Sequence, residues 1–244
     1  MKSIGLILIS LSLLMTACSS GKNANELHVV TSAEYPPFEY IDNGQLRGFD
    51  IDLVKLVVKK LGMKVVFDNV QFSTVLASLD SGKADMAIST ITITPLRAKN
   101  FDFSEPYYFE SIAAVYPIDH PVTNQAQLMN KKIACQLGST MEIWLKKNGF
   151  VAQITVLNNS NQSIEALKAG LVNVVIMDGV QGFVFSHKTP GLSYSTIAQS
   201  TDGYGIAFAI HSPLKPKVNE ILHQLNASGA LNQLKLKWLG ANHE

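Results

Sequence analysis

The sequence predicts an α/β protein built as two lobes, each a mostly parallel sheet flanked by helices. Short apolar runs alternate with segments of helical period twice along the chain, over residues 27–89 and again over residues 132–177. Each copy reads as βαβαβ, and such connections join parallel strands. Two further apolar runs, residues 112–117 and 205–210, are expected to carry the chain from the first lobe to the second and back.

The individual elements follow from periodicity and from turn residues. In the first copy we expect strands at 27–31, 64–67 and 84–89 and helices at 49–61 and 72–79. In the second copy we expect strands at 132–136, 153–157 and 172–177, helices at 139–147 and 161–169, and terminal helices within 213–239. Lobe 1 is thus predicted to comprise 27–113 and 207–244, and lobe 2 to comprise 114–206.

The composition excludes several classes of function. The 244 residues are 47% apolar and 16% charged, and 20 Lys and Arg stand against 19 Asp and Glu. A chain so nearly neutral, without a basic stripe, is not expected to bind nucleic acid. The six histidines show no metal-ligand spacing, and no glycine-rich phosphate loop is present. We expect no metal and no cofactor.

The N-terminus reads as a targeting segment. Lys2 precedes an apolar run that is too short to span a bilayer, so residues 1–17 are predicted to be a signal peptide. The sequence LMTACS at residues 14–19 resembles a bacterial lipoprotein signal. That resemblance implies a lipidated Cys18 as membrane anchor, followed by a polar tether over 18–26. The alternative is a plain secretory signal with an incidental cysteine. Cys135 is then expected to be a free buried thiol.

The stretch AISTITITPLR, residues 87–97, contains a cation in an unfavourable place. Its first part reads as a strand, Thr94 as a helix N-cap and Pro95 as the first helical position, which puts Arg97 at the third. The helix macrodipole disfavours a cation there by about 0.3–1 kcal/mol. We therefore expect Arg97 to serve something other than the helix.

An anion site is the first interpretation of Arg97. Its guanidinium, the hydroxyl of Thr92 and the free N–H groups of a helix start suit a carboxylate, which guanidinium binds in bidentate geometry. The alternative is an ion pair with a nearby acid, Asp102 or Glu105.

Asp178 follows the predicted strand 172–177, whose C-terminal end is expected to face the space between the lobes. It is either a helix cap or, opposite an anion site, an acceptor for an ammonium group. The turn at residues 136–140 adds N–H groups and the hydroxyl of Thr140. A guanidinium on one lobe and a carboxylate on the other are what an α-amino acid zwitterion needs.

Six motifs together resemble one protein family, the polar amino-acid family of ABC-transporter periplasmic solute-binding proteins, in its lipoprotein form. The motifs are YPPFE at 35–39, GFDIDL at 48–53, GKAD at 82–85, TITPLR at 92–97, FSEPY at 103–107 and GST at 138–140. They follow one another along residues 27–240. The resemblance implies a two-lobed type II periplasmic binding protein fold with two hinge strands.

The resemblance also assigns the ligand head group. It implies that Arg97 holds the α-carboxylate, assisted by Thr92, by the backbone around Thr90 and by Thr140. It implies that Asp178 takes the α-ammonium.

For the ligand side chain, the resemblance matches Tyr35 and Phe72 to covering aromatics; the alternative is plain core residues. Asp50 matches a position that meets basic side chains, and Glu34 and Glu39 lie close in sequence. Members that bind basic amino acids often carry an acid where this chain has Ser32, so Glu34 is an alternative source of that charge.

The predicted function is capture of a free L-amino acid by lobe closure and its delivery to a membrane ABC permease. Arginine or another basic amino acid is favoured, with glutamine, histidine and cystine as alternatives. We expect a monomer in the periplasm or on the outer face of the cell envelope. A cyclohexadienyl or arogenate dehydratase on the same scaffold is the competing enzyme; Asp178 argues against it, and no catalytic residue is assigned.

Overall fold

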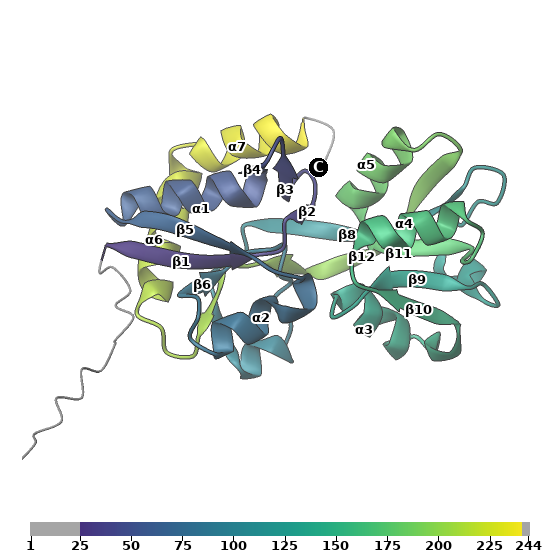
Figure 1. Cartoon of the computed structure of the whole chain (residues 1–244), viewed down its shortest axis with the longest axis horizontal. Coiled ribbons are helices and arrows are strands. Elements are labelled where there is room, and N and C mark those ends of the chain that lie inside the picture. Colours follow the sequence, from purple (N-terminus) through teal and green to yellow (C-terminus); the bar gives the residue numbers. More distant parts are fainter. Residues whose placement is uncertain (1–24, 241–244) are drawn as a thin grey trace, which may run out of the picture.

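The computed structural model describes residues 25–240, which form two lobes side by side (Figure 1). One lobe contains both ends of the described chain, and the other contains its middle. The two-lobed α/β fold expected from the sequence is confirmed. The predicted signal peptide, Cys18 and the last four residues lie outside the described residues.

Lobe 1 is built on a five-stranded sheet in the order β5-β1-β6-β13-β7. β5, β1 and β6 are parallel, whereas β13 runs antiparallel to both of its neighbours. Its strands are β1 (Glu26–Thr31), β5 (Lys64–Asn69), β6 (Met86–Ala87), β7 (Phe101–Phe103) and β13 (Ala207–Ala209). A small sheet is formed by β2 (Glu34–Tyr35), β3 (Glu39–Asp42) and β4 (Gln45–Arg47).

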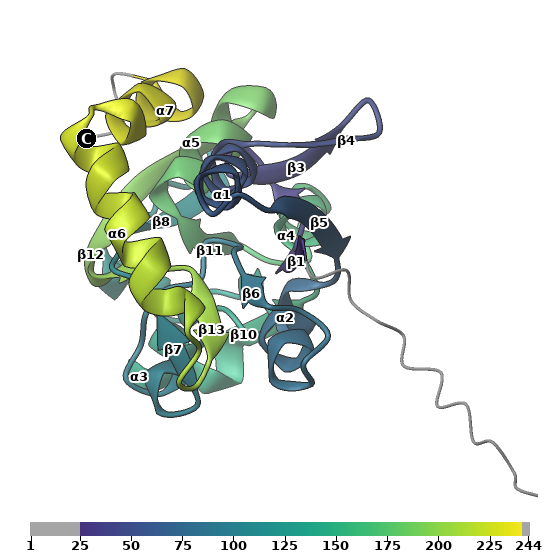
Figure 2. The same cartoon turned by 90° about the vertical axis from the view of Figure 1, so that its left-hand side faces the viewer.

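Four helices cover the lobe 1 sheet: α1 (Phe49–Lys60), α2 (Phe72–Asp80), α6 (Leu214–Ala227) and α7 (Ala230–Leu239). Figure 2 shows α6 and α7 together along one side of this lobe. α1 buries Ile51, Val54, Val57 and Val58, the apolar face that its periodicity predicts. None of the helices within residues 25–240 is long and apolar enough to cross a membrane.

Lobe 2 repeats the plan with the order β10-β9-β11-β8-β12. β10, β9 and β11 are parallel, and β8 is antiparallel to β11 and β12. Its strands are β8 (Tyr108–Pro117), β9 (Ile133–Gln136), β10 (Ile154–Leu157), β11 (Val174–Asp178) and β12 (Leu192–Tyr204); its helices are α3 (Thr140–Lys147), α4 (Ser160–Lys168) and α5 (Gly179–Lys188). Cys135 on β9 is free and buried, as predicted.

The start of α3 is held by a reciprocal cap. The Ser139 hydroxyl accepts the N–H of Glu142 at 3.2 Å, and the Glu142 carboxylate accepts the N–H of Gly138 at 2.8 Å. These two hydrogen bonds fix the turn after β9, so Thr140 is presented at the boundary between the lobes.

The crossings between the lobes lie elsewhere than predicted. Residues 112–117 were expected to cross, but they pair with β11 and β12 inside the lobe 2 sheet. Within the second expected crossing, 205–210, residues 207–209 pair with β6 and β7 inside the lobe 1 sheet. The chain crosses earlier on β8 and at the end of β12, because Tyr108 and Tyr204 pair with each other and pack in the lobe 1 core. Figure 1 shows β8 and β12 running together between the lobes. The lobe limits at 113/114 and 206/207 stay a prediction.

Two local expectations around Arg97 are wrong. The strand expected at 84–89 is only two residues long, Met86–Ala87, and Thr90 after it adopts a left-handed φ of 45°. The expected α-helix is a 3₁₀ turn, Arg97–Lys99. Thr94 still accepts the N–H of Arg97, at 3.2 Å. Three residues cannot build a macrodipole, so the dipole argument does not explain this arginine.

Candidate functional site

A cavity lies between the two lobes, and it collects most of the side chains that the sequence singled out. Lobe 1 contributes Tyr35, Phe72, Thr90, Thr92 and Arg97, and lobe 2 contributes Thr140 and Asp178. An adjoining pocket is lined by Ser32, Glu34 and Glu39, together with Tyr35, Phe72 and Thr90. Asp50 is fully buried and lines neither space.

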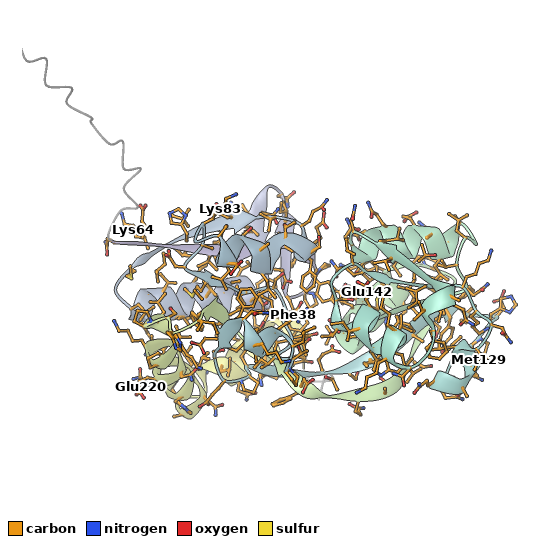
Figure 3. The ribbon with its side chains drawn as sticks, turned by 90° about the horizontal axis from the view of Figure 1, so that it is seen from below. Phe38, Lys64, Lys83, Met129, Glu142 and Glu220 are labelled. Atoms are coloured by element: carbon orange, nitrogen blue, oxygen red, sulfur yellow. The ribbon has the colours of Figure 1, made fainter. Side chains whose placement is uncertain are left out.

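Hydrogen bonds join the lobes across this cavity at its arginine end. The Thr92 and Thr140 hydroxyls are 3.2 Å apart, and the Arg97 guanidinium donates to the carbonyl of Gly138 at 3.0 Å. Figure 3 shows Phe38 among the packed side chains of lobe 1 and Glu142 on the lobe 2 side of this boundary. The turn before α3 therefore rests directly on the arginine of the other lobe.

The lobes are also joined at the Asp178 end. The Tyr35 hydroxyl donates to the Asp178 carboxylate, and the Gln181 side chain on α5 donates to the carbonyl of Pro36. Hydrogen bonds at both ends of the cavity mean that the lobes are closed on each other.

Arg97 is held by neutral groups. It donates to the carbonyl of Thr92 at 2.8 Å, and its guanidinium carbon lies 5.9 Å from the centre of the Phe72 ring. Burial lowers the pKa of Arg97 to about 10, so the group stays charged at neutral pH. Among the described residues, no carboxylate lies within ion-pair distance of it.

The predicted alternative partners of Arg97 are engaged elsewhere. Asp102 pairs with Lys215 at 2.9 Å, and Glu105 pairs with His223 at 3.2 Å. The ion-pair alternative is therefore wrong, and the guanidinium keeps its charge available to the cavity.

Asp178 stands at the N-cap position of α5, yet its side chain makes no capping hydrogen bond. The helix-cap alternative is therefore wrong as well. Its carboxyl is buried, and burial raises the pKa of Asp178 while nearby donors and the charge of Arg97 oppose that rise. A buried carboxylate facing a cavity without a cationic contact is suited to an incoming cation.

A second pair of buried acids consists of Glu39, which lines the adjoining pocket, and Asp50, which lies behind Glu39. One Asp50 oxygen accepts the N–H of Thr90 and the hydroxyl of Tyr107, both at 2.9 Å. Ser89 donates to Glu39 at 3.0 Å. Burial raises the pKa of Asp50 to about 7; burial, then the charge of Asp50, raises the pKa of Glu39. The pair favours sharing one proton over carrying two charges.

Several residues of the site escaped the sequence reasoning. Ser160 and Ser163 line the cavity, and Glu110 lies beside Asp178. Gln136 also lines the cavity. The sequence singled out its turn, 136–140, for the N–H groups, and the rule that selected Asp178 points to Gln136 as well, because it ends a parallel strand. No comparable signal marks Glu110, since its neighbours come from strands far apart in the sequence. Within residues 25–240, no group of three or more His, Cys, Asp or Glu side chains is arranged to hold a metal.

Comparison with known proteins places this geometry in a family. Residues 27–241 match the model of the bacterial extracellular solute-binding proteins, family 3. The arginine-binding extracellular protein ArtP of Bacillus subtilis is 29% identical over 245 residues, covering 96% of this chain and 95% of that protein. The L-cystine-binding protein TcyJ of Escherichia coli is 28% identical over 226 residues, covering 91% of this chain and 85% of that protein.

A solved structure agrees with the sequence matches. An ancestral arginine-binding protein bound to arginine superposes with a TM-score of 0.85 at 35% identity, covering 88% of this chain and 99% of that one. The relatives are solute-binding proteins rather than enzymes. The chain therefore belongs to the bacterial extracellular solute-binding proteins, family 3.

Proposed function

We propose that this protein captures a free amino acid by lobe closure outside the cytoplasm and delivers it to an ABC permease. The observation that carries the proposal is a single cavity lined by Arg97 from lobe 1 and Asp178 from lobe 2, neither of them engaged in an ion pair within the described chain. One group suits an α-carboxylate and the other an α-ammonium. Thr92 and Thr140 are the proposed assistants of the carboxylate site, and Cys18 is the proposed lipid anchor.

Arginine, or another basic amino acid, is the proposed ligand. Glu34 and Glu39 line the pocket next to the cavity, and Asp50 lies behind Glu39. A buried carboxyl pair beside the pocket favours a ligand with a cationic side chain, because such a ligand supplies the counter-charge that the pair lacks. Tyr35 and Phe72 are the proposed flanking aromatics.

Calorimetry of the full-length protein against the twenty common amino acids, ornithine and cystine tests the function. Arg97→Ala and Asp178→Ala are each expected to weaken binding by about 30- to 5,000-fold, because truncating one partner of a buried charge pair costs about 2–5 kcal/mol. Arg47→Ala and Asp42→Ala are the matched controls, since these two form an exposed ion pair with each other. Full affinity in both cavity variants, or turnover of prephenate or arogenate, would overturn the assignment.

Glu39→Gln tests the class of ligand. The variant keeps the shape of the side chain and removes its ability to ionise beside a cationic ligand. The affinity for arginine should therefore fall by about 10- to 100-fold, as expected for a lost charge-assisted hydrogen bond. The affinity for glutamine, measured in parallel, should change little. A glutamine complex tighter than the arginine complex in the unmodified protein would reassign the ligand.

A further inference from the structure

Glu110 is a buried acid that the proposed function does not use. It lies on β8, it is 7% exposed, and neither of its carboxyl oxygens has a hydrogen-bond partner within the described residues. Ile112, two residues further along β8, pairs with Asp178 across the antiparallel register. Side chains two apart share a face of the sheet, so Glu110 lies diagonally beside Asp178.

The groups that act on the charge of Glu110 are negative or neutral. The charge of Asp178 disfavours its ionised form, whereas the hydroxyl of Tyr204 and the N–H of Gly179 at the start of α5 favour it. Besides burial, the charge of Glu110 raises the pKa of Tyr35 from β2 and of Tyr108 from β8.

Two cations among the described residues belong to the surroundings of Glu110, and neither forms an ion pair with it. Burial raises the pKa of Asp178, and the charge of Arg97, which lines the same cavity, opposes that rise. Lys147 from α3 and Asp202 from β12 line a groove together with Glu110, but no ion pair of Glu110 is found among residues 25–240.

Two carboxyl groups in one buried site cannot both ionise cheaply, so the pair holds a proton. Burial, followed by the charge of Asp178, raises the pKa of Glu110 well above its ordinary range. The hydroxyl of Tyr35, which donates to Asp178, favours the charged form of that residue instead. Of the two carboxyl groups, Glu110 is therefore the one whose protonated form is favoured.

Resting on the proposed function, we propose that Glu110 is a positioning residue of the ammonium site: it holds the proton of the Glu110–Asp178 pair, and the arriving ligand ammonium expels it. The carboxylic acid of Glu110 loses its O–H proton to solvent, and the ammonium keeps all of its own protons. The products are two carboxylates beside one ammonium and one proton in solution. Capture of the amino acid is thereby coupled to proton release.

Calorimetric titration of the full-length protein with L-arginine, in buffers of different ionisation enthalpy between pH 6 and 8.5, counts the protons released. The unmodified protein should release up to one proton more than Glu110→Gln, which cannot ionise. Its affinity should accordingly rise by up to about tenfold per pH unit relative to that variant, since the slope equals the protons released. Glu110→Ala should show the same loss if Glu110→Gln does not fold.

Glu105→Gln is the matched control, because Glu105 is exposed and pairs with His223 away from the cavity; its proton count should equal that of the unmodified protein. Equal counts in the unmodified protein and Glu110→Gln would overturn the inference and leave the proposed function standing. The inference would also be overturned if replacing Glu110 lowered the melting temperature without changing the proton count, because Glu110 would then only support α5. If no amino acid produces heat, the proposed function falls and the inference falls with it.

Discussion

Asp50 shows at the level of one residue how burial and hydrogen bonding compete for a proton. The side chain is wholly buried, which disfavours its charge, whereas the N–H of Thr90 and the hydroxyl of Tyr107 stabilise that charge. Burial is the larger effect, and the pKa rises from 3.8 to about 7. The residue is therefore partly protonated near neutral pH, and a basic ligand side chain would draw it toward the charged form.

This pKa predicts how the stability of the ligand-free protein depends on pH. An acid with a raised folded-state pKa binds more protons in the folded than in the unfolded chain between about pH 4 and pH 7. The free energy of unfolding should therefore fall as the pH rises through that window, and the contribution of Asp50 should change little above it. Urea unfolding at pH 4.5 and pH 7.5 measures the change.

Asp50→Asn provides the comparison, because the amide cannot titrate. The decline in unfolding free energy between the two pH values should be smaller in this variant than in the unmodified protein. A decline of the same size in both proteins would show that Asp50 does not titrate in this window.

At the scale of elements, the entry to α1 depends on one backbone conformation. Gly48, the residue before α1, has a φ of 128°, and a Cβ there would overlap the carbonyl oxygen of Phe38. This close approach lets the N–H of Phe49 reach the carbonyl of Pro37 and the N–H of Asp50 reach that of Phe38, at 3.0 and 2.9 Å. The turn thus places Asp50 beneath the pocket.

Gly48→Ala should therefore destabilise the protein strongly. The backbone conformation alone costs a non-glycine residue about 1–3 kcal/mol, and the overlap adds to it. Gly62→Ala is the matched control: φ there is 72° and nothing lies within 4 Å of the added Cβ, so a cost of about 1–2 kcal/mol is expected. Denaturant unfolding of both variants measures the difference, and equal losses would contradict the role given to the Phe38 contact.

At the scale of the whole molecule, closure brings together side chains that neither lobe combines alone. Arg97 contacts the turn before α3, Tyr35 contacts Asp178, and Thr92 meets Thr140. A ligand that bridges Arg97 and Asp178 binds the closed form better than the open one, so it shifts the population toward closure.

Ligand binding should consequently raise the melting temperature of the molecule. A ligand at 100 times its dissociation constant stabilises by about 2.7 kcal/mol, which corresponds to roughly 5–10 °C for a chain of this size. Thermal unfolding with and without L-arginine measures the shift, with Asp178→Ala as the variant expected to show a much smaller one. A shift of the same size in Asp178→Ala would mean that the ligand does not need the second lobe.

The fold and the cavity differ in how far the sequence predicts them. The repeated βαβαβ succession predicts both lobes, because periodicity records which face of each element is buried. Arg97 and Asp178 are identifiable because they follow apolar strands, and ligands of open parallel sheets bind outside the carboxyl ends of the strands. Short or irregular elements are predicted less well: the 3₁₀ turn at Arg97–Lys99 and the two-residue β6 depend on contacts with distant segments.

The sequence by itself determined the alternation of strands and helices, the family and the charged groups at the strand ends. Tertiary structure decided where the hinge strands cross, that Asp178 leaves α5 uncapped, and that Glu110 lies beside it. The physical reason is that periodicity and turn residues act over a few positions. The charge and hydrogen bonding of a buried acid are set instead by partners such as Tyr35, which is 143 residues away from Asp178 and meets it only when the lobes close.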